Sequence, residues 1–278
     1  MNSRRLSCLL IFTALAVAAR AQVVAFPNFS STTGLQLNSA EVTTGGAVLL
    51  AANQQNRSGS FFTSTQLDVT DFSALFQFRI SSPGGQNDGT SAGADGLALV
   101  MQRVAATALG GNGEALGYGP RGGTSAIGTS VAVEFDTFAN GWDPNSNHIG
   151  LNLNGSLTSL ASTNVADAFD SGLLWTVWVD YNGTTLEVRA SNNGVRPVSA
   201  TLAQALDVAT TIGGTTAFIG FTASTGSAYG THEVVAFAYS TNYVEGGLTM
   251  VPEPSTYALL ALGLGCVGLA VWRRRARR

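Results

Sequence analysis

One segment carries most of the structural information in this chain: Val131-Ala-Val-Glu-Phe-Asp-Thr-Phe-Ala-Asn-Gly-Trp-Asp-Pro-Asn-Ser-Asn-His-Ile-Gly150. Its beginning alternates in polarity, so Val131, Val133 and Phe135 share the core face of a strand. Glu134 and Asp136 then project together from the opposite face. Two carboxylates held this close raise each other's pKa, and a cation between them removes that penalty. The segment therefore predicts a strand that binds a cation at its polar face.

The loop after this strand supplies further metal ligands. Asn140 and Asp143 offer side-chain oxygens, an exposed carbonyl can add another, and His148 opens the next predicted strand, Ile149 to Leu153. Hard oxygen ligands suit Ca²⁺, whereas carboxylates combined with one imidazole suit Mn²⁺ or another first-row ion. The segment contains both ligand sets. The alternative is an ordinary polar loop with a surface histidine.

The rest of the chain is typical of an all-β protein. Segments that alternate with a period of two place every second side chain on one face of a sheet, and Asn182-Gly183 predicts a hairpin turn. We expect strands at Phe72–Ile80, Trp175–Tyr181, Thr185–Val188, Ala217–Phe221 and Val234–Tyr239, with long loops at Ser82–Gly93 and Leu109–Ser125. No linker or repeat divides residues 22–247, so one antiparallel β-sandwich domain is predicted there.

The charge distribution excludes one class of partner. The chain has 278 residues, of which 11% are charged, and its 14 basic residues are all arginine. Residues 22–247 contain six arginines and 16 acidic residues, which gives a formal charge of −10 with neutral histidines. Such a domain repels phosphate, which argues against nucleic-acid binding. It suits a metal ion or an uncharged sugar instead.

Both ends of the chain are predicted to be targeting segments. Residues 1–21 have the features of a secretory signal peptide: a positive start, a short apolar run and the cleavage site Ala19-Arg20-Ala21. Near the other end, an apolar helix over 257–272 precedes the arginine-rich tail 273–278 and predicts a membrane anchor with that tail in the cytoplasm. The two cysteines, Cys8 and Cys266, fall in these segments, so the domain has neither a disulfide nor a thiolate metal site.

The metal segment resembles the signature of the legume, or L-type, lectins. The matching pattern is Glu134-Phe-Asp136-Thr-Phe138-x-Asn140-x-Trp142-Asp143-Pro144 followed by His148-Ile149-Gly150, without a gap. The resemblance implies a Ca²⁺ held by Asp136, Asn140, Asp143 and the carbonyl of Phe138. It also implies a Mn²⁺ held by Glu134, Asp136, Asp143 and His148. Ser159 is a candidate for a water-mediated contact to the second ion, although its spacing departs from the family by one residue.

Other segments extend this resemblance and imply a concanavalin-like antiparallel β-sandwich, or jelly roll. Ser58–Phe62 resembles an early strand of the family, and Gly93–Leu99 resembles its A-D-G loop, in which Ala94–Asp95 is a cis peptide. Gly220–Gly226, followed by His232 at the expected start of a strand, resembles the strand and loop that close the sugar site. The alternative for Ala94–Asp95 alone, and for Gly220–Gly226 alone, is an ordinary turn.

The resemblance also implies a site for a neutral glycan. Asp95 would accept hydrogen bonds from two sugar hydroxyls, Asn140 would donate one, and Phe138 would pack against the sugar ring. A backbone N–H of the glycine-rich loop, which we assign to Gly113, would complete the set. Here the sequence departs from the family, because the equivalent position can also be taken as Glu114. Tyr229 could stack on a second sugar unit or remain solvated.

The last residues, 248–278, resemble the PEP-CTERM sorting signal of Gram-negative bacteria. Val251-Pro-Glu-Pro254, the apolar helix and the arginine cluster occur in the order typical of that signal. The resemblance implies recognition by an exosortase, removal of the helix, and a final position at the cell surface or in the extracellular matrix. The protein would be anchored in the inner membrane only transiently.

Two other functions compete with a lectin. A glycoside hydrolase of similar fold would carry Glu-x-Asp-x-Glu on one strand, with its two carboxyl groups about 5–5.5 Å apart. This chain has Phe138 at the third position, so we expect no enzyme. A structural matrix protein with a metal-braced lectin fold but no sugar binding is the second alternative. A homo-oligomer is possible, since lectins of this family often pair through a flat back sheet.

Overall fold

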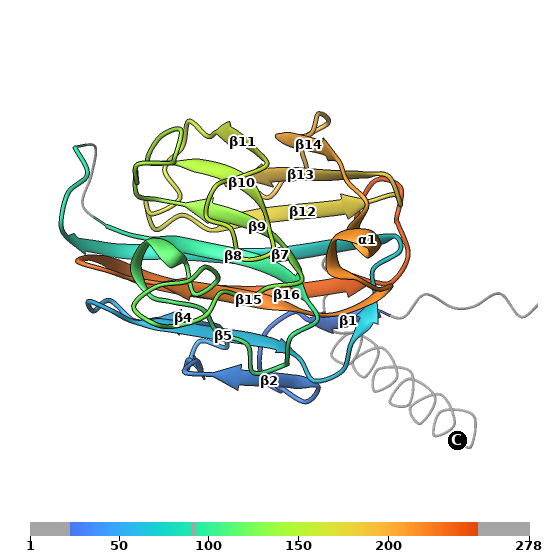
Figure 1. The fold of residues 1–278 in the computed structure, drawn as a ribbon, viewed down its shortest axis with the longest axis horizontal. Helices are drawn as coiled ribbons and strands as arrows, with labels where there is room; N and C mark the ends of the chain where they lie inside the picture. Colours follow the sequence, from blue (N-terminus) through green and yellow to red (C-terminus); the bar gives the residue numbers. More distant parts are fainter. Residues whose placement is uncertain (1–22, 90–92, 250–278) are drawn as a thin grey trace, which may run out of the picture.

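The protein is a sandwich of two antiparallel β-sheets (Figure 1). The computed structural model describes residues 23–89 and 93–249, so the predicted signal peptide and the predicted membrane helix lie outside the described residues. Each sheet has eight strands, and every strand pairing within them is antiparallel. The predicted all-β sandwich is therefore confirmed.

Sheet A is built around the two longest strands of the fold. Its strands, in spatial order, are β14 (Leu202–Ala205), β13 (Thr185–Ser191), β12 (Trp175–Tyr181), β7 (Phe72–Gly85), β16 (Ala228–Ser240), β4 (Val48–Ala51) and β3 (Glu41–Val42), and β1 (Val23–Phe26) also pairs with β16. The strands β7 and β16 run side by side from Ser73 paired with Ser240 to Gly85 paired with Ala228. The predicted strands Phe72–Ile80 and Val234–Tyr239 lie within this central pair.

Sheet B contains the strand predicted to bind metal. Its order is β11 (Ala161–Asn164), β10 (His148–Leu153), β9 (Ser130–Asp136), β8 (Gly96–Gln102), β15 (Thr216–Ser224), β5 (Ser58–Thr63) and β2 (Leu35–Asn38), and β6 (Leu67–Asp68) pairs with β15. The short helix α1 (Val208–Ile212) and a 3₁₀ helix (Gly113–Ala115) are the helical elements of the described residues. In those residues no helix is both long and apolar enough to cross a membrane.

The two sheets meet in a core rich in phenylalanine. Phe76 of β7 contacts Phe135 of β9 and Phe221 of β15, with ring centroids 5.7 and 4.8 Å apart. These side chains are fully buried, as the alternating patterns of their strands predict. Burial of Phe135 on one face of β9 fixes the opposite face, which carries Glu134 and Asp136.

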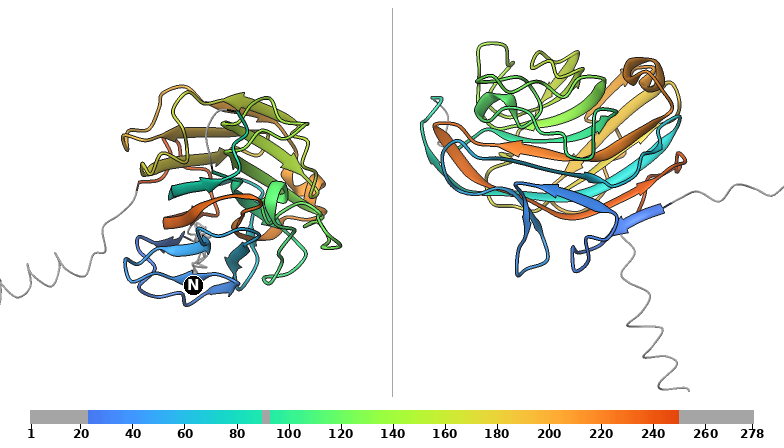
Figure 2. Two further views of the ribbon diagram at one scale, coloured as in Figure 1. Left: turned by 90° about the vertical axis from the view of Figure 1, so that its left-hand side faces the viewer. Right: turned by 60° about the horizontal axis from the view of Figure 1, so that its bottom comes forward.

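A second apolar cluster holds the loop between β8 and β9 against the outer face of sheet B (Figure 2). Tyr118 of this loop packs with Val100 and Ala132 of the sheet. Its hydroxyl pairs with Ser130 Oγ at 2.9 Å and accepts a hydrogen bond from the Gly155 N–H at 2.8 Å. These contacts anchor the glycine-rich loop beside the end of β8.

The segment Val244–Thr249, which we call the C-terminal strap, packs on the outer face of sheet A at β7 and β12. Trp178 Nε1 donates to the Leu248 carbonyl at 3.0 Å, and the Val244 N–H donates to Ser73 Oγ at 3.0 Å. Trp178 is consequently only 5% exposed although it faces away from the core. The strap is thus part of the packed domain.

The predicted strands agree with the structure except at some boundaries. β12 has the predicted bounds, and Asn182 Oδ1 accepts from the Thr184 and Thr185 N–H groups in the predicted turn. The predicted loop at Ser82–Gly93 is wrong at its beginning, because β7 continues to Gly85 opposite β16. His232 lies within β16 and does not begin it. Both strands are longer than predicted because their pairing partners continue past the end of the apolar pattern.

Candidate metal and carbohydrate site

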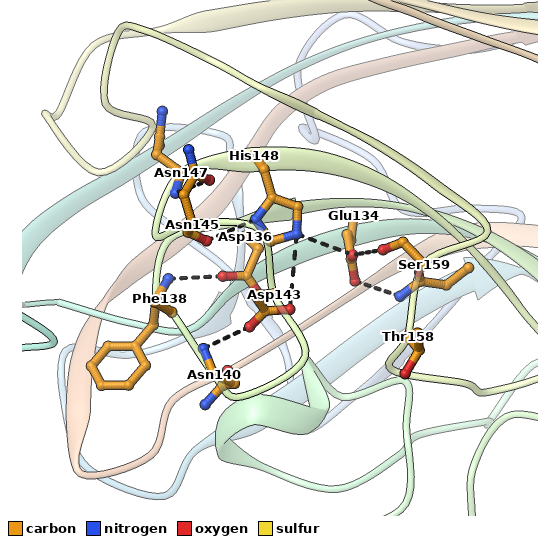
Figure 3. Close-up of polar contacts among 12 residues, drawn as sticks. Glu134, Asp136, Phe138, Asn140, Asp143, Asn145, Asn147, His148, Thr158 and Ser159 are labelled. Atoms are coloured by element: carbon orange, nitrogen blue, oxygen red, sulfur yellow. Dashed lines mark hydrogen bonds and ion pairs between the residues drawn. The ribbon is translucent and has the colours of Figure 1, made fainter.

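Pairing of β9 with β10 brings the metal-ligand candidates together (Figure 3). Asp136 lies opposite His148 in this register, and Glu134 lies opposite Gly150. The loop between the two strands returns Asp143 to the same place. One ligand atom from each of Asp136, Asp143 and His148 lies within 4.8 Å of the others. The three residues can therefore contact one ion.

The imidazole of His148 is oriented toward this cluster. Its Nδ1 lies 3.1 Å from the Asn145 carbonyl, which can only accept, so Nδ1 carries the proton of the neutral ring. Nε2 is buried, lacks a hydrogen-bond partner, and lies 3.4 Å from Glu134 Oε1 and 4.0 Å from Asp143 Oδ1. In the neutral ring the lone pair of Nε2 would therefore face these carboxylates, where it can bind a metal ion that they share.

Glu134 is held by two neighbours from the same sheet region. Ser159 Oγ donates to Glu134 Oε1 at 2.6 Å, and Asn152 Nδ2 donates to Oε2. The contact between Glu134 and Ser159 lies over Gly150, where a Cβ would overlap Glu134 Oε1 and Ser159 Oγ. Asn152 was not among the residues predicted from the sequence. Its position two residues after Gly150 on β10 was the available signal, because alternate residues share one face.

Backbone N–H groups of the loop after β9 donate hydrogen bonds to neighbouring carboxylates. Asp136 Oδ1 accepts from the Phe138 N–H at 2.8 Å, and Asp143 Oδ2 accepts from the Asn140 N–H at 2.7 Å. Asp88, from the loop between β7 and β8, accepts from the Ala139 N–H at 3.1 Å. Asn140 Oδ1 is buried and has no hydrogen-bond partner. These bonds fix the backbone around Phe138, which is itself half-buried.

The electrostatics of the cluster favour a cation. Burial, and then the charges of Asp143 and Glu134, raise the pKa of Asp136 well above its usual range. Burial also raises the pKa of Asp143 to about 6, against the lowering effect of the Asn140 N–H and His148. Carboxylates forced together in this way bind divalent ions readily, because the ion replaces mutual repulsion with attraction.

The donor set therefore fits the two predicted ions. The unpartnered Asn140 Oδ1, the carboxylates of Asp136 and Asp143, and the Phe138 carbonyl are all oxygen ligands of the kind Ca²⁺ takes. Glu134 and the free Nε2 of His148 add the ligand types suited to a first-row ion.

Asp95 lies directly beside the loop that follows β9. The Ala94–Asp95 peptide is cis, as predicted, and the Asp95 carbonyl accepts from the Thr137 N–H at 3.0 Å. The side chain is buried, and its Oδ2 has no hydrogen-bond partner. Burial and the nearby Glu114 raise the pKa of Asp95 to about 8, although Arg121 and the Gly226 N–H lower it.

Gly113 lies close to Asp95 but does not offer the donor expected of it. Its N–H donates to the Thr225 carbonyl at 3.0 Å, so this N–H is already used within the protein. The structure instead places the ion pair of Glu114 and Arg121 here, with Arg121 Nη1 3.1 Å from Glu114 Oε2. Arg121 was not predicted from the sequence. Its long side chain lies over a loop, and the sequence pattern does not specify the path of that loop.

Tyr229 packs on its own sheet. A Cβ on Gly84 would lie 2.7 Å from the Tyr229 ring, and one on Gly85 would lie 2.9 Å from it. The ring thus covers the end of β7 and is neither a fully solvated loop side chain nor a free stacking surface. The predicted contact with a second sugar unit receives no support from this position.

Comparison with known proteins identifies the family. A model of the legume lectin domain matches residues 22–251, and the PEP-CTERM protein-sorting motif matches residues 251–275. The first match spans most of the chain, so this protein belongs to the legume lectin domain family. Both resemblances found in the sequence are thereby confirmed.

Known plant lectins are similar over most of the domain. Lectin 11 of Medicago truncatula is 29% identical over 195 residues, which are 65% of this chain and 64% of that protein. The L-type lectin-domain containing receptor kinase VIII.1 of Arabidopsis thaliana is 32% identical over 181 residues, or 63% of this chain and 24% of the kinase. The chain therefore spans less than two thirds of either relative.

Solved lectin structures share the fold. The acidic lectin of winged bean, bound to methyl-α-D-galactose, superposes with a TM-score of 0.65 and 23% identity over 80% of this chain and 98% of that one. A Bauhinia forficata lectin in complex with GalNAc gives the same TM-score, identity and coverage. At this identity the likeness establishes the two-sheet architecture.

Proposed function

We propose that residues 22–247 form a secreted, surface-sorted domain that binds a neutral glycan in a Ca²⁺- and Mn²⁺-dependent manner. This proposal rests on three buried polar atoms that lack a hydrogen-bond partner: Asp95 Oδ2, Asn140 Oδ1 and His148 Nε2. They lie in or beside the loop between β9 and β10. A buried polar atom without a partner costs about 1–3 kcal/mol. Ligands that satisfy these atoms explain why the fold keeps them.

In this proposal each metal ligand has a defined role. Asp136, Asn140, Asp143 and the Phe138 carbonyl would hold Ca²⁺, and Glu134, Asp136, Asp143 and His148 would hold Mn²⁺ or another first-row ion. When bound, the ions supply fixed positive charge and perform no chemistry on the sugar. They would reduce the entropy lost on sugar binding by ordering the loop beforehand.

The sugar would contact residues on both sides of this loop. Asp95 accepts hydrogen bonds from sugar hydroxyls, the Asn140 amide donates one while its oxygen stays on Ca²⁺, and Phe138 packs against the ring. Gly113 would border the site, but its N–H donates to the Thr225 carbonyl and is not available to the sugar. The winged bean and Bauhinia forficata lectins are bound to galactose-type sugars, which makes such sugars the first probes.

The two ends of the chain would determine its export and its final location. Residues 1–21 would direct export and be removed, and 248–278 would act as the sorting signal, with the helix 257–272 spanning the inner membrane before an exosortase releases it. The sorting-motif match at 251–275 supports this assignment. The final position would be the cell surface or the extracellular matrix of a Gram-negative bacterium, where extracellular polysaccharide or a neighbouring cell offers the glycan.

A glycan array probed with the 22–249 domain tests the function. Binding to a defined saccharide with both metals present, lost on chelation, is the expected result. Two bound metal ions without binding to any glycan would support the second candidate, a metal-braced matrix protein, in which the charge of Glu114 near Asp95 disfavours the ionised acceptor that a sugar needs. We propose no catalytic activity, since Phe138 stands where a hydrolase would place its acid.

A further inference from the structure

The side chain of Arg121 lies across the glycine-rich loop. A Cβ on Gly113 would overlap the Arg121 guanidinium, so this contact requires a glycine at position 113. The guanidinium is held from two more directions: Nη1 lies 3.2 Å from the Asn112 carbonyl oxygen and 3.1 Å from Glu114 Oε2. The position of this cation is therefore set by the loop and is not that of a freely moving surface side chain.

The held guanidinium points to the same space as Asp95. The position that a Cβ on Gly226 would take lies 3.4 Å from Asp95 Oδ2 and 3.6 Å from Arg121 Nη1. One small region beside Gly226 is thus bordered by an unpartnered acceptor and by a charged donor. The Gly113 Cα lies 3.2 Å from the same position, so a side chain at Gly226 would fill the space between these groups.

The loop offers no donor at Gly113, whose N–H is bonded to Thr225. Arg121 is about one third exposed. Its Nη1 faces the Asn112 carbonyl, Asn112 Oδ1 and Glu114 Oε2, whereas Nε and Nη2 donate to no residue that the structure describes and keep three N–H groups for a ligand. It can therefore hydrogen-bond to a ligand without releasing the contacts that position it.

We propose that Arg121 is a specificity-determining residue of the glycan site and donates a hydrogen bond to the sugar beside Asp95. This inference rests on the proposed carbohydrate binding. The paired acceptor and donor select an uncharged saccharide with two adjacent hydroxyls: one donates to Asp95 and its neighbour accepts from Arg121. Glu114, which is paired with Arg121, acts together with Asp95 to repel a carboxylate on the sugar and so excludes uronic acids.

Two variants that break the same ion pair test this role. Arg121→Gln removes the charged donor, whereas Glu114→Gln removes only its partner. With galactose, N-acetylgalactosamine and galacturonic acid as probes on a glycan array, we expect Arg121→Gln to weaken binding of the neutral sugar by about tenfold or more, as for loss of one charged hydrogen bond. Glu114→Gln should keep binding of the neutral sugar and increase binding of galacturonic acid.

Controls separate this inference from the proposed function. Arg103→Gln, at the opposite end of β8, should leave binding unchanged, and all three variants should match the wild type in Ca²⁺ titration and melting temperature. Equal losses in Arg121→Gln and Glu114→Gln would overturn the inference, because the ion pair would then only shape the loop. Wild-type binding retained in Arg121→Gln would also overturn it, and would leave glycan binding itself established. Failure of the wild type to bind any glycan on the array would overturn both.

Discussion

Ser159 Oγ donates a hydrogen bond of 2.6 Å to Glu134 Oε1, and the two side chains meet over Gly150. Glu134 belongs to β9, Gly150 to the neighbouring β10, and Ser159 follows β10 in the chain. This contact turns one carboxylate oxygen toward His148 Nε2, 3.4 Å away. A glycine in the middle of a strand is unfavourable for the strand itself, and here it makes room for a contact that orients Glu134, a proposed metal ligand.

Substitution of Gly150 by alanine should therefore weaken binding of the transition metal. The added Cβ would overlap both Glu134 Oε1 and Ser159 Oγ, and so one of them must move. Loss of such an orienting contact typically lowers metal affinity about 10–100-fold. Titration with Mn²⁺, monitored calorimetrically, measures the change. Gly141→Ala is the matched control, because a Cβ at Gly141 meets no atom within 4 Å; equal affinities in the two variants would contradict the role of Gly150.

Asp95 and Asn140 can be tested with nearly isosteric substitutions. Measured above pH 8, where the Asp95 carboxyl is ionised, Asp95→Asn removes a charged acceptor but no volume, so sugar binding should fall by roughly tenfold or more while Ca²⁺ affinity remains. Asn140→Asp keeps an oxygen for Ca²⁺ and removes the amide donor, so it should also lose sugar binding and keep the metal. Sugar affinity and Ca²⁺ affinity measured on the same preparations separate the two functions. Parallel loss of both would show that the residues act only through the metal.

Much of this site could be predicted because it lies within one continuous segment. Alternation along β9 assigns Glu134 and Asp136 to one face, and the next strand must return His148 beside them if the two strands pair. Local sequence is sufficient for such a site, since its geometry follows from one strand, one loop and one neighbouring strand. The pairing of Asp136 with His148 confirms this reasoning.

Contacts between distant loops could not be predicted in the same way. The Gly113 N–H is used by Thr225, and Arg121 crosses Gly113, because the loop between β8 and β9 packs on sheet B through Tyr118. The path of a glycine-rich loop depends on where its few apolar side chains find a surface, which the sequence pattern does not specify. The packing of the C-terminal strap could not be predicted for the same reason, because Leu248 contacts Trp178, which is 70 residues away in the sequence.

The raised pKa of Asp95 predicts a pH dependence of stability. The folded-state pKa is about 8, above the ordinary value of 3.8, because burial disfavours the charged form. The contribution of this group to stability is therefore complete below pH 3.8 and is lost as the pH rises toward 8. Relative to Asp95→Asn, the metal-free wild type should lose on the order of 1 kcal/mol of unfolding free energy per pH unit in this interval.

Urea unfolding of both proteins in chelator, between pH 5 and 9, measures that difference. Groups other than Asp95 contribute similarly to wild type and variant, and so they cancel in the comparison. A difference that does not change with pH would mean that the Asp95 carboxyl is ionised throughout the range. Sugar affinity offers an independent readout: protonation removes an acceptor, so binding should weaken as the pH is lowered through the pKa of Asp95.

Metal removal should abolish sugar binding but leave the sandwich folded. The phenylalanine core around Phe76 and Phe221 is separate from the acidic loop, so it does not need the ions. A ligand present at about 100 times its dissociation constant stabilises the folded state by about 2.7 kcal/mol. Chelation should lower the melting temperature accordingly and keep the far-ultraviolet β-sheet spectrum. Complete unfolding in chelator would mean that the ions are required for the fold itself.

From the contacts of the C-terminal strap, we expect residues just before the sorting motif to stabilise the domain. Trp178→Phe keeps most of the ring but removes the Nε1 donor to Leu248, at an expected cost of about 1 kcal/mol. A domain ending at residue 243 loses that bond together with the bond from Val244 to Ser73. It also uncovers Trp178, so its tryptophan fluorescence should shift to longer wavelength and become accessible to iodide. Adding Trp178→Phe to the shortened domain should cause almost no further loss of stability, because the partner of Nε1 is already gone; additive losses would show that Trp178 acts independently of the strap.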